Sequence, residues 1–113
     1  MRGIGVDFVS LSHLETVLGE RFREAVFTPA EIEYAETSGR ALAHYGTAFA
    51  GKEAVFKALR RGWTDGTDVE IRRDTDGVPR VGLSGPLAAV PDDDVLLTLS
   101  FDRGYAVAFA VYR

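Results

Sequence analysis

A line of four residues in the middle of the chain combines two small side chains with an acid and a base. These residues are Gly46, Ala50, Glu53 and Lys57, and at about 100° per residue they fall within a narrow arc of a helix surface. The small residues would form a shelf on which a ligand could lie close to the backbone. An acid and a base four residues apart can also be a plain surface pair, worth only about 0.3–0.5 kcal/mol. The line therefore indicates either a binding shelf with a charged edge or a solvated ion pair.

The helix that carries this line is predicted to run from about Arg40 to Arg61. The segment is rich in helix formers and contains no proline between Ala41 and Arg61. Apolar residues recur in it at three-and-four spacing, so a neighbouring face of the helix is predicted to be core. This series consists of Leu42, Tyr45, Phe49, Phe56 and Leu59. Lys52 occupies the one missing step of the apolar series.

A second chemical feature lies near the start of the chain. Residues 2–9 predict a short buried strand that runs into an aspartate, because Ile4, Val6, Phe8 and Val9 are apolar and β-prone. A solvated sheet edge does not usually have this appearance. The alternative interpretation of Asp7 is an Asx cap or turn at the end of a strand.

Together these two stretches resemble the holo-acyl-carrier-protein synthase family of 4′-phosphopantetheinyl transferases. That family has a Gly-x-Asp at the end of its first strand, which corresponds to Gly5-Val6-Asp7. It also has a Phe-Ala-x-Lys-Glu-Ala-x-x-Lys-Ala helix, and residues 49–58 match it position by position. The spacing between the motifs, the chain length and the closing strands also fit. The resemblance covers essentially the whole chain, and its two motifs are specific only in combination.

The resemblance implies transfer of the phosphopantetheine arm of coenzyme A to a serine of an apo acyl carrier protein. Breaking the pyrophosphate bond then needs a divalent cation, because negative charge builds up on the phosphate oxygens. Mg²⁺ typically takes one or two carboxylates together with phosphate oxygens and water, and the resemblance assigns these carboxylates to Asp7 and Glu53. Lys57 would be the third catalytic residue, neutralising the pyrophosphate or protonating the leaving 3′,5′-adenosine bisphosphate. Either a metal-bound water or a carboxylate would accept the serine proton.

The coenzyme A contacts implied by the resemblance extend beyond these three residues. They are expected at Lys52, Lys57, Gly46, Ala50 and Ser100. Three positions depart from the family pattern. Ala48 replaces a common arginine, Phe101 replaces a histidine that lies near the phosphates, and His13 occupies the neighbourhood where a basic residue often follows the first strand in the carrier-docking helix. Phenylalanine can neither carry charge nor form a hydrogen bond through its side chain. The departures keep open an alternative, a non-catalytic descendant that binds a carrier protein or coenzyme A without transfer.

The expected protein partner is an apo acyl carrier protein, for example of fatty-acid or polyketide synthesis, which presents an acidic helix. Arg21, Phe22 and Arg23 are expected to bind it through charge and apolar contact. The resemblance also implies a homotrimer with active sites at subunit interfaces. Lys52, Arg60 and Arg61 could then act across an interface instead.

Composition limits the other possibilities. The chain has 113 residues, a net charge of −4 and no cysteine, which predicts a single domain over residues 1–113 without disulfides or thiolate chemistry. The negative charge argues against a nucleic-acid-binding surface. No stretch approaches the roughly 20 apolar residues of a membrane span, and we expect a cytoplasmic protein.

The remaining pattern predicts an α+β fold with an antiparallel sheet packed on the long central helix. Ser10 or Ser12 can cap a short helix, and Thr28-Pro29 with Glu31 is a strong helix start. A hairpin is predicted around Asp76-Gly77. Residues 95–101 and 105–112 predict two strands that are apolar at nearly every position, which is typical of central strands covered on both faces.

Overall fold

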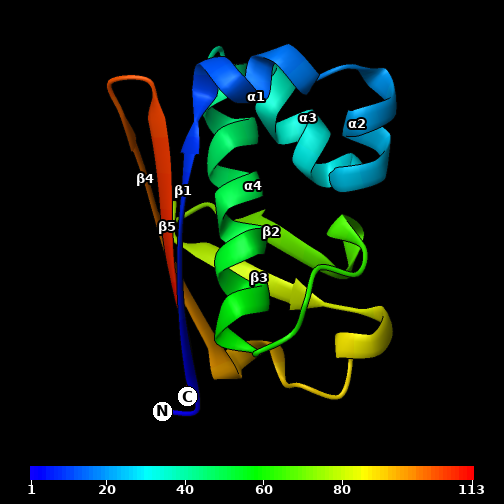
Figure 1. Cartoon of the computed structure of the whole chain (residues 1–113), viewed down its shortest axis with the longest axis vertical. Coiled ribbons are helices and arrows are strands. Elements are labelled where there is room, and N and C mark those ends of the chain that lie inside the picture. Colours follow the sequence, from blue (N-terminus) through cyan, green and yellow to red (C-terminus); the bar gives the residue numbers. More distant parts are fainter.

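The computed structural model describes residues 1–113 and contains four helices and five strands in an α+β arrangement (Figure 1). In chain order they are β1 (Gly3–Ser10), α1 (Leu11–Val17), α2 (Glu20–Val26), α3 (Pro29–Thr37), α4 (Ala41–Ala58), β2 (Val69–Arg73), β3 (Pro79–Leu83), β4 (Val95–Asp102) and β5 (Tyr105–Tyr112). Single-turn 3₁₀ helices cover Gly66–Asp68, Gly85–Leu87 and Asp92–Asp94. The predicted fold class is confirmed.

Helix α4 is the centre of the molecule. One side of it lies along an antiparallel sheet with strand order β1-β5-β4, and the β2–β3 hairpin packs against its other side. Helices α1 to α3 gather at one end of α4, and the two chain termini lie side by side at the other end (Figure 1). One continuous cluster of 19 buried residues fills the space between these elements. No helix is long and apolar enough to cross a membrane.

Capping residues explain where the short helices begin. The Thr28 hydroxyl accepts a hydrogen bond from the Glu31 N–H, and the Glu31 carboxylate accepts one from the Thr28 N–H, so the predicted capping box at α3 is formed. At α1 the cap is Ser10, whose hydroxyl accepts a hydrogen bond from the His13 N–H. Since β1 runs directly into α1, the residue that ends the strand also caps the helix.

Strand β1 approaches α4 very closely, because glycines face the helix. A Cβ atom on Gly5 would lie 2.0 Å from the carbonyl oxygen of Ala54, and one on Gly3 would lie 1.8 Å from that of Ala58. No side chain larger than hydrogen fits at either position. The glycines therefore hold β1, including Asp7, against the second half of α4.

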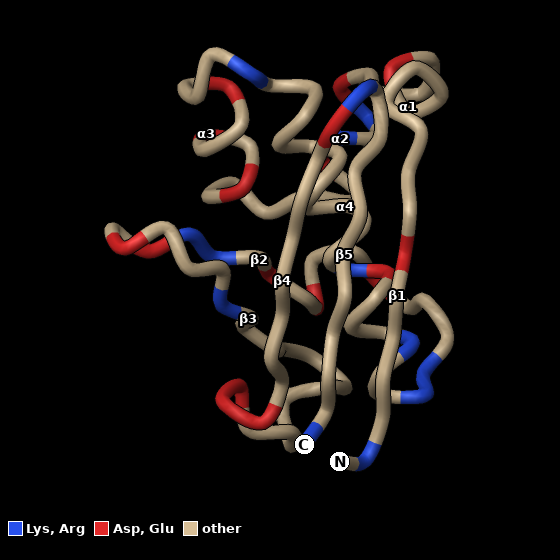
Figure 2. Tube along the Cα trace, turned by 90° about the vertical axis from the view of Figure 1, so that its left-hand side faces the viewer, with Lys and Arg blue, Asp and Glu red and all other residues tan.

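The expectation that β4 and β5 are covered on both faces is wrong for the single chain. β4 is an edge strand, and one face of the sheet is open to solvent. We call this the open sheet face; its large apolar residues are 37–65% exposed and are Ile4, Val6, Phe8, Leu96, Tyr105, Val107 and Phe109. Figure 2 views this side and shows three strands almost free of charged residues. The residues are as apolar as the pattern indicated, but the chain supplies no second layer to cover them.

Candidate active site

Asp7, Glu53 and Lys57 are brought together where the middle of β1 lies against α4, since β1 continues beyond Asp7 to Ser10. The Lys57 ammonium is 3.2 Å from a carboxylate oxygen of Asp7 and donates a hydrogen bond of 3.0 Å to the Val6 carbonyl oxygen. The Lys57 side chain remains 52% exposed, whereas that of Asp7 is 18% exposed. Lys57 therefore joins the strand to the helix and still faces solvent, where a substrate phosphate could reach it.

Glu53 is an acid whose charge is unfavourable in the isolated protein. Burial raises the pKa of its carboxyl group, the nearby Asp7 carboxylate raises this pKa further, and Lys57 lowers it in part. A hard cation between the two carboxylates would relieve both effects, and carboxylate oxygens are the ligands that Mg²⁺ prefers. No group of three or more acidic or histidine side chains is arranged to hold a metal. The donors therefore fit an ion that substrate and water oxygens would also coordinate.

A groove of about 320 Å³ opens over these carboxylates. It is lined by Asp7, Phe8, Val9, Ser10, His13, Phe49 and Glu53. His13 and Phe49 were not predicted to line the site. Phe49 belonged to the predicted core series, and His13 was noted only as a departure from the family pattern. The Ser10 cap, which places the first turn of α1 directly after β1, was the available signal for His13.

A larger hollow of about 380 Å³ lies elsewhere, between β3, β4 and the C-terminus. Its arginines are already paired: Arg80 lies 2.8 Å from Asp74, Arg72 lies 2.9 Å from Glu70, and Arg113 donates to the Asp93 carbonyl. None of the predicted catalytic residues lines it. Size alone therefore does not identify the site, and the smaller groove carries the reactive groups.

The structure contradicts the expectation that Lys52 contacts coenzyme A. The side chain is fully buried, its ammonium lies 2.7 Å from the Glu31 carboxylate, and it also donates to the carbonyl oxygens of Gly66 and Val69. All three N–H donors are thus used inside the protein. Lys52 cannot touch a phosphate in the groove, nor can it act across a subunit interface.

The structure also contradicts the expectation that Gly46 and Ala50 form a shelf for a ligand. Ala50 is fully buried, and a Cβ atom on Gly46 would lie 2.3 Å from the Leu11 side chain and 3.3 Å from that of Ala106. The small residues allow α4 to pack closely against its protein neighbours, which leaves no room there for a ligand. Only the charged end of the predicted line, Glu53 and Lys57, reaches the surface.

Ser100 lies on the opposite side of the sheet from Asp7. It pairs with Val107, which pairs with Phe8, and all three are exposed on the open sheet face. Directly paired residues point to the same face of a sheet, whereas Asp7 faces α4. Within one chain, Ser100 is therefore not brought to the groove.

Two of the departures from the family pattern, Ala48 and Phe101, occupy packed positions. Ala48 is buried, and Phe101 is half-buried with its ring 5.7 Å from that of His44. The guanidinium of Arg40 lies 5.6 Å from the centre of the Phe101 ring. A cation is thus present beside Phe101, although the aromatic side chain itself carries none.

The predicted carrier-binding residues lie on α2. Arg21 is exposed, whereas Arg23 lies 3.6 Å from Glu36 and stacks over the Tyr45 ring. Phe22 is half-buried with its ring 6.0 Å from that of Phe49, which lines the groove. The three residues are therefore close in sequence but differ in availability, and Phe22 connects α2 to the wall of the site.

Comparison with known proteins shows the family of the chain. The family model of the 4′-phosphopantetheinyl transferase superfamily matches residues 3–110. The chain is 44% identical to holo-[acyl-carrier-protein] synthase of Paramagnetospirillum magneticum, covering 96% of this chain and 92% of the relative. It is 34% identical to that of Thermodesulfovibrio yellowstonii, covering 98% and 97%.

Solved structures agree as well. Helicobacter pylori holo-[acyl-carrier-protein] synthase in complex with coenzyme A superposes with a TM-score of 0.84 at 26% identity, covering 97% of this chain and 99% of that chain. The Neisseria meningitidis enzyme superposes with a TM-score of 0.86 at 27% identity, covering 100% and 98%. From the match over residues 3–110 and the identity to curated relatives over nearly their full length, the chain belongs to the holo-[acyl-carrier-protein] synthase family of enzymes within the 4′-phosphopantetheinyl transferase superfamily.

Proposed function

We propose that this chain transfers the 4′-phosphopantetheine group of coenzyme A to a serine hydroxyl of an apo acyl carrier protein in a Mg²⁺-dependent reaction. The observation that carries the proposal is the convergence of Asp7 from β1 with Glu53 from α4 at one groove, together with the Lys57 ammonium paired to Asp7. Two carboxylates and a half-exposed ammonium group match a substrate that carries a pyrophosphate. Helix α4 supplies Glu53 and, one turn later, Lys57, and strand β1 supplies the second carboxylate, Asp7.

In this reaction the serine oxygen forms a bond to the phosphorus that carries the pantetheine arm. The bond from this phosphorus to the bridging pyrophosphate oxygen breaks, and 3′,5′-adenosine bisphosphate leaves with the electron pair. Asp7 and Glu53 would hold the Mg²⁺, which supplies positive charge for the phosphate oxygens. The Lys57 ammonium neutralises the pyrophosphate or donates a proton to the leaving phosphate. A carboxylate or a water molecule in the groove accepts the serine proton.

The carrier protein is proposed to dock over α2. Arg21 is the exposed cation there, and Phe22 lies against Phe49 in the groove wall. The acidic run Asp92–Asp94 lies at the other end of the molecule (Figure 1), whereas α2 itself carries the exposed acids Glu20 and Glu24 beside Arg21. The proposed contact with an acidic helix therefore rests on Arg21 as a single local cation and on the apolar Phe22, not on a net positive surface. Arg23, which Glu36 already neutralises, contributes less charge.

We further propose that the enzyme is a homotrimer of single-domain chains, in which the open sheet face is covered by neighbouring copies. This assembly would bring Ser100, which no groove of its own chain reaches, toward the substrate bound to a neighbour. One continuous core supports a single domain over residues 1–113. The cytoplasmic location expected from the sequence stays a prediction.

The test is mass spectrometry of apo carrier proteins after incubation with this protein, coenzyme A and Mg²⁺. We expect the carrier to gain one phosphopantetheine mass, and this gain should be lost with Glu53→Gln or when Mg²⁺ is chelated. Glu33→Gln, which changes an exposed glutamate on α3, is the matched control and should retain activity.

A different outcome would support the non-catalytic alternative. If coenzyme A raises the melting temperature but several apo carriers, including fatty-acid and polyketide ones, gain no mass, the chain binds without transfer. Ala48 and Phe101 would then mark the lost chemistry. Phe101→His, beside Arg40, is the variant that should restore it, because Ala48 is buried and leaves no room for an arginine.

A further inference from the structure

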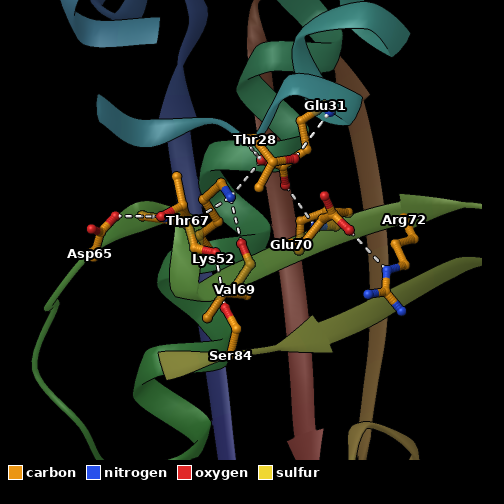
Figure 3. A network of polar contacts seen from close by, with 11 residues as sticks. Thr28, Glu31, Lys52, Asp65, Thr67, Val69, Glu70, Arg72 and Ser84 are labelled. Atoms are coloured by element: carbon orange, nitrogen blue, oxygen red, sulfur yellow. Dashed lines mark hydrogen bonds and ion pairs between the residues drawn. The ribbon is translucent and has the colours of Figure 1, made fainter. Parts of the chain in front are cut away.

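A buried ion pair lies on the side of α4 that faces away from the groove (Figure 3). The Lys52 ammonium is 0% exposed and lies 2.7 Å from Oε1 of Glu31, whose side chain is 2% exposed. Lys52 also donates to the carbonyl oxygen of Gly66 at 2.8 Å and to that of Val69. Both partners are thus removed from solvent and from the substrate, although Lys52 directly precedes Glu53 in the chain.

The Glu31 carboxylate connects three segments of the fold. Its Oε1 atom accepts the Thr28 N–H at 2.8 Å in addition to the Lys52 ammonium, and its Oε2 atom accepts the Ile71 N–H at 2.7 Å. The start of α3, the middle of α4 and the first residues of β2 are therefore tied together at one carboxylate. Every charged atom of the pair has a partner, which is the condition under which buried charge is tolerated.

The opposite side of α4 is fixed at the same height along the helix. Gly5 allows β1 to lie directly on the Ala54 carbonyl oxygen, so Lys52 and Ala54 hold the helix from two sides with Glu53 between them. Asp7 is two residues beyond Gly5 on the same face of β1. A shift or rotation of α4 away from β2 would change the separation of the Asp7 and Glu53 carboxylates.

Stability alone does not require a charged pair at this place. Replacing a buried ion pair by well-packed neutral side chains is often neutral or stabilising, so an apolar contact between α4 and β2 would hold the fold. What directed hydrogen bonds add is a defined position of one element on another. The network joins the one turn of α4 that carries a candidate metal ligand.

We propose that Lys52 and Glu31 are positioning residues that fix α4 against β1 and thereby set the separation of the Asp7 and Glu53 carboxylates. The proposal rests on the proposed function, because it assigns these carboxylates to a cation and a pyrophosphate. It gives the lysine of the Lys-Glu motif a role that requires burial rather than contact with the substrate.

The double variant Glu31→Gln with Lys52→Met tests this role with a neutral pair of similar shape. Its amide oxygen can still accept an N–H from Thr28 or Ile71, so we expect a folded protein with a cooperative melt. Glu31→Gln alone, which keeps an oxygen acceptor for Lys52, is the second variant if the double variant does not fold. We expect kcat to fall about tenfold or more, as for other partners of metal ligands, with the KM for coenzyme A changed by less than about twofold.

Mn²⁺ binding to the carrier-free protein, read by electron paramagnetic resonance with coenzyme A present, provides a readout besides activity. We expect the variants to bind Mn²⁺ about tenfold or more weakly than the unchanged protein. Arg73→Met is the matched control: Arg73 also joins β2 to α4, through a 2.8 Å hydrogen bond to the Thr47 hydroxyl, but does so away from Glu53. It should leave Mn²⁺ binding unchanged.

A folded double variant with unchanged kcat and unchanged Mn²⁺ binding would overturn the positioning role. Equal weakening by Arg73→Met would also overturn it, because any loosening of α4 would then have the same effect. If the unchanged protein binds no Mn²⁺, the metal site of the proposed function fails instead, which is a distinguishable result.

Discussion

At the scale of single residues, Glu53 combines a functional position with an unfavourable charge. Its raised pKa means that the folded protein holds the Glu53 proton more tightly than the unfolded chain does. The ionised form that a cation requires is therefore the form that burial and Asp7 oppose. A protein without bound metal carries this cost at neutral pH, and binding of a cation removes it. Lys57 partly offsets the unfavourable charge of Glu53 by lowering its pKa. It also contacts Asp7 while its side chain remains exposed.

This argument predicts that Glu53→Gln stabilises the metal-free protein at neutral pH. Below 4.5, the ordinary pKa of glutamate, Glu53 is protonated in both states, so the difference from the variant should disappear. The stability of the unchanged protein relative to the variant is thus greatest in acid and is lost as the pH rises through the folded pKa of Glu53. Melting temperatures measured at neutral pH and below 4.5 check the sign. Glu33→Gln, at an exposed position, should show no such pH-dependent difference in melting temperature. A lower melting temperature for Glu53→Gln than for the unchanged protein at neutral pH would contradict the prediction.

At the scale of elements, the close approach of β1 to α4 determines whether the two carboxylates meet. A Cβ atom on Gly5 would lie 2.0 Å from the Ala54 carbonyl oxygen, and this neighbour is backbone that cannot move without the helix. We therefore expect Gly5→Ala to destabilise the protein by about 1–3 kcal/mol, as overpacking does, and to lower kcat more than Glu33→Gln does. Gly62→Ala is the control, because nothing lies within 4 Å of its added Cβ atom. Chemical denaturation measures both, and equal stability of the two variants would contradict the close contact.

The elements also show what could be predicted from the sequence. Local signals were sufficient for the helix starts, the hairpins and the long helix, because caps, turns and periodicity act within a few residues. The proximity of Asp7 to Glu53 and Lys57 could be predicted only with the help of the family motifs, since a pattern along the chain does not show which strand meets which helix. Lys52 occupies a step of the apolar core series and is buried in the structure, although its burial was not predicted. The motif interpretation as a phosphate ligand was wrong because the partner, Glu31, comes from a distant segment.

At the scale of the whole molecule, only one face of the β1-β5-β4 sheet is covered by the rest of the chain. Helix α4 covers one face of the β1-β5-β4 sheet, and the open sheet face carries apolar side chains with almost no charge (Figure 2). Exposed apolar surfaces of this kind in soluble proteins usually mark an interaction site. Nearly continuous apolar strands predicted burial on both faces, and the pattern cannot distinguish a second layer of the same chain from another copy. The same ambiguity applies to Ser100, which lies on that face and away from the groove of its own chain.

The homotrimer can be tested at the middle of this face. Phe109 is on the central strand β5, is 41% exposed and pairs with Val6 and Thr98, so Phe109→Glu would place a charge inside the proposed interface without touching the groove. Light scattering should find a trimer for the unchanged protein and a monomer for the variant. Transfer activity should fall with the trimer, because Ser100 would no longer reach a neighbour's substrate. Val78→Glu, at an exposed apolar residue in the β2–β3 hairpin, should keep both. A fully active Phe109→Glu monomer would show that each chain has a complete site, and the open sheet face would then need another partner.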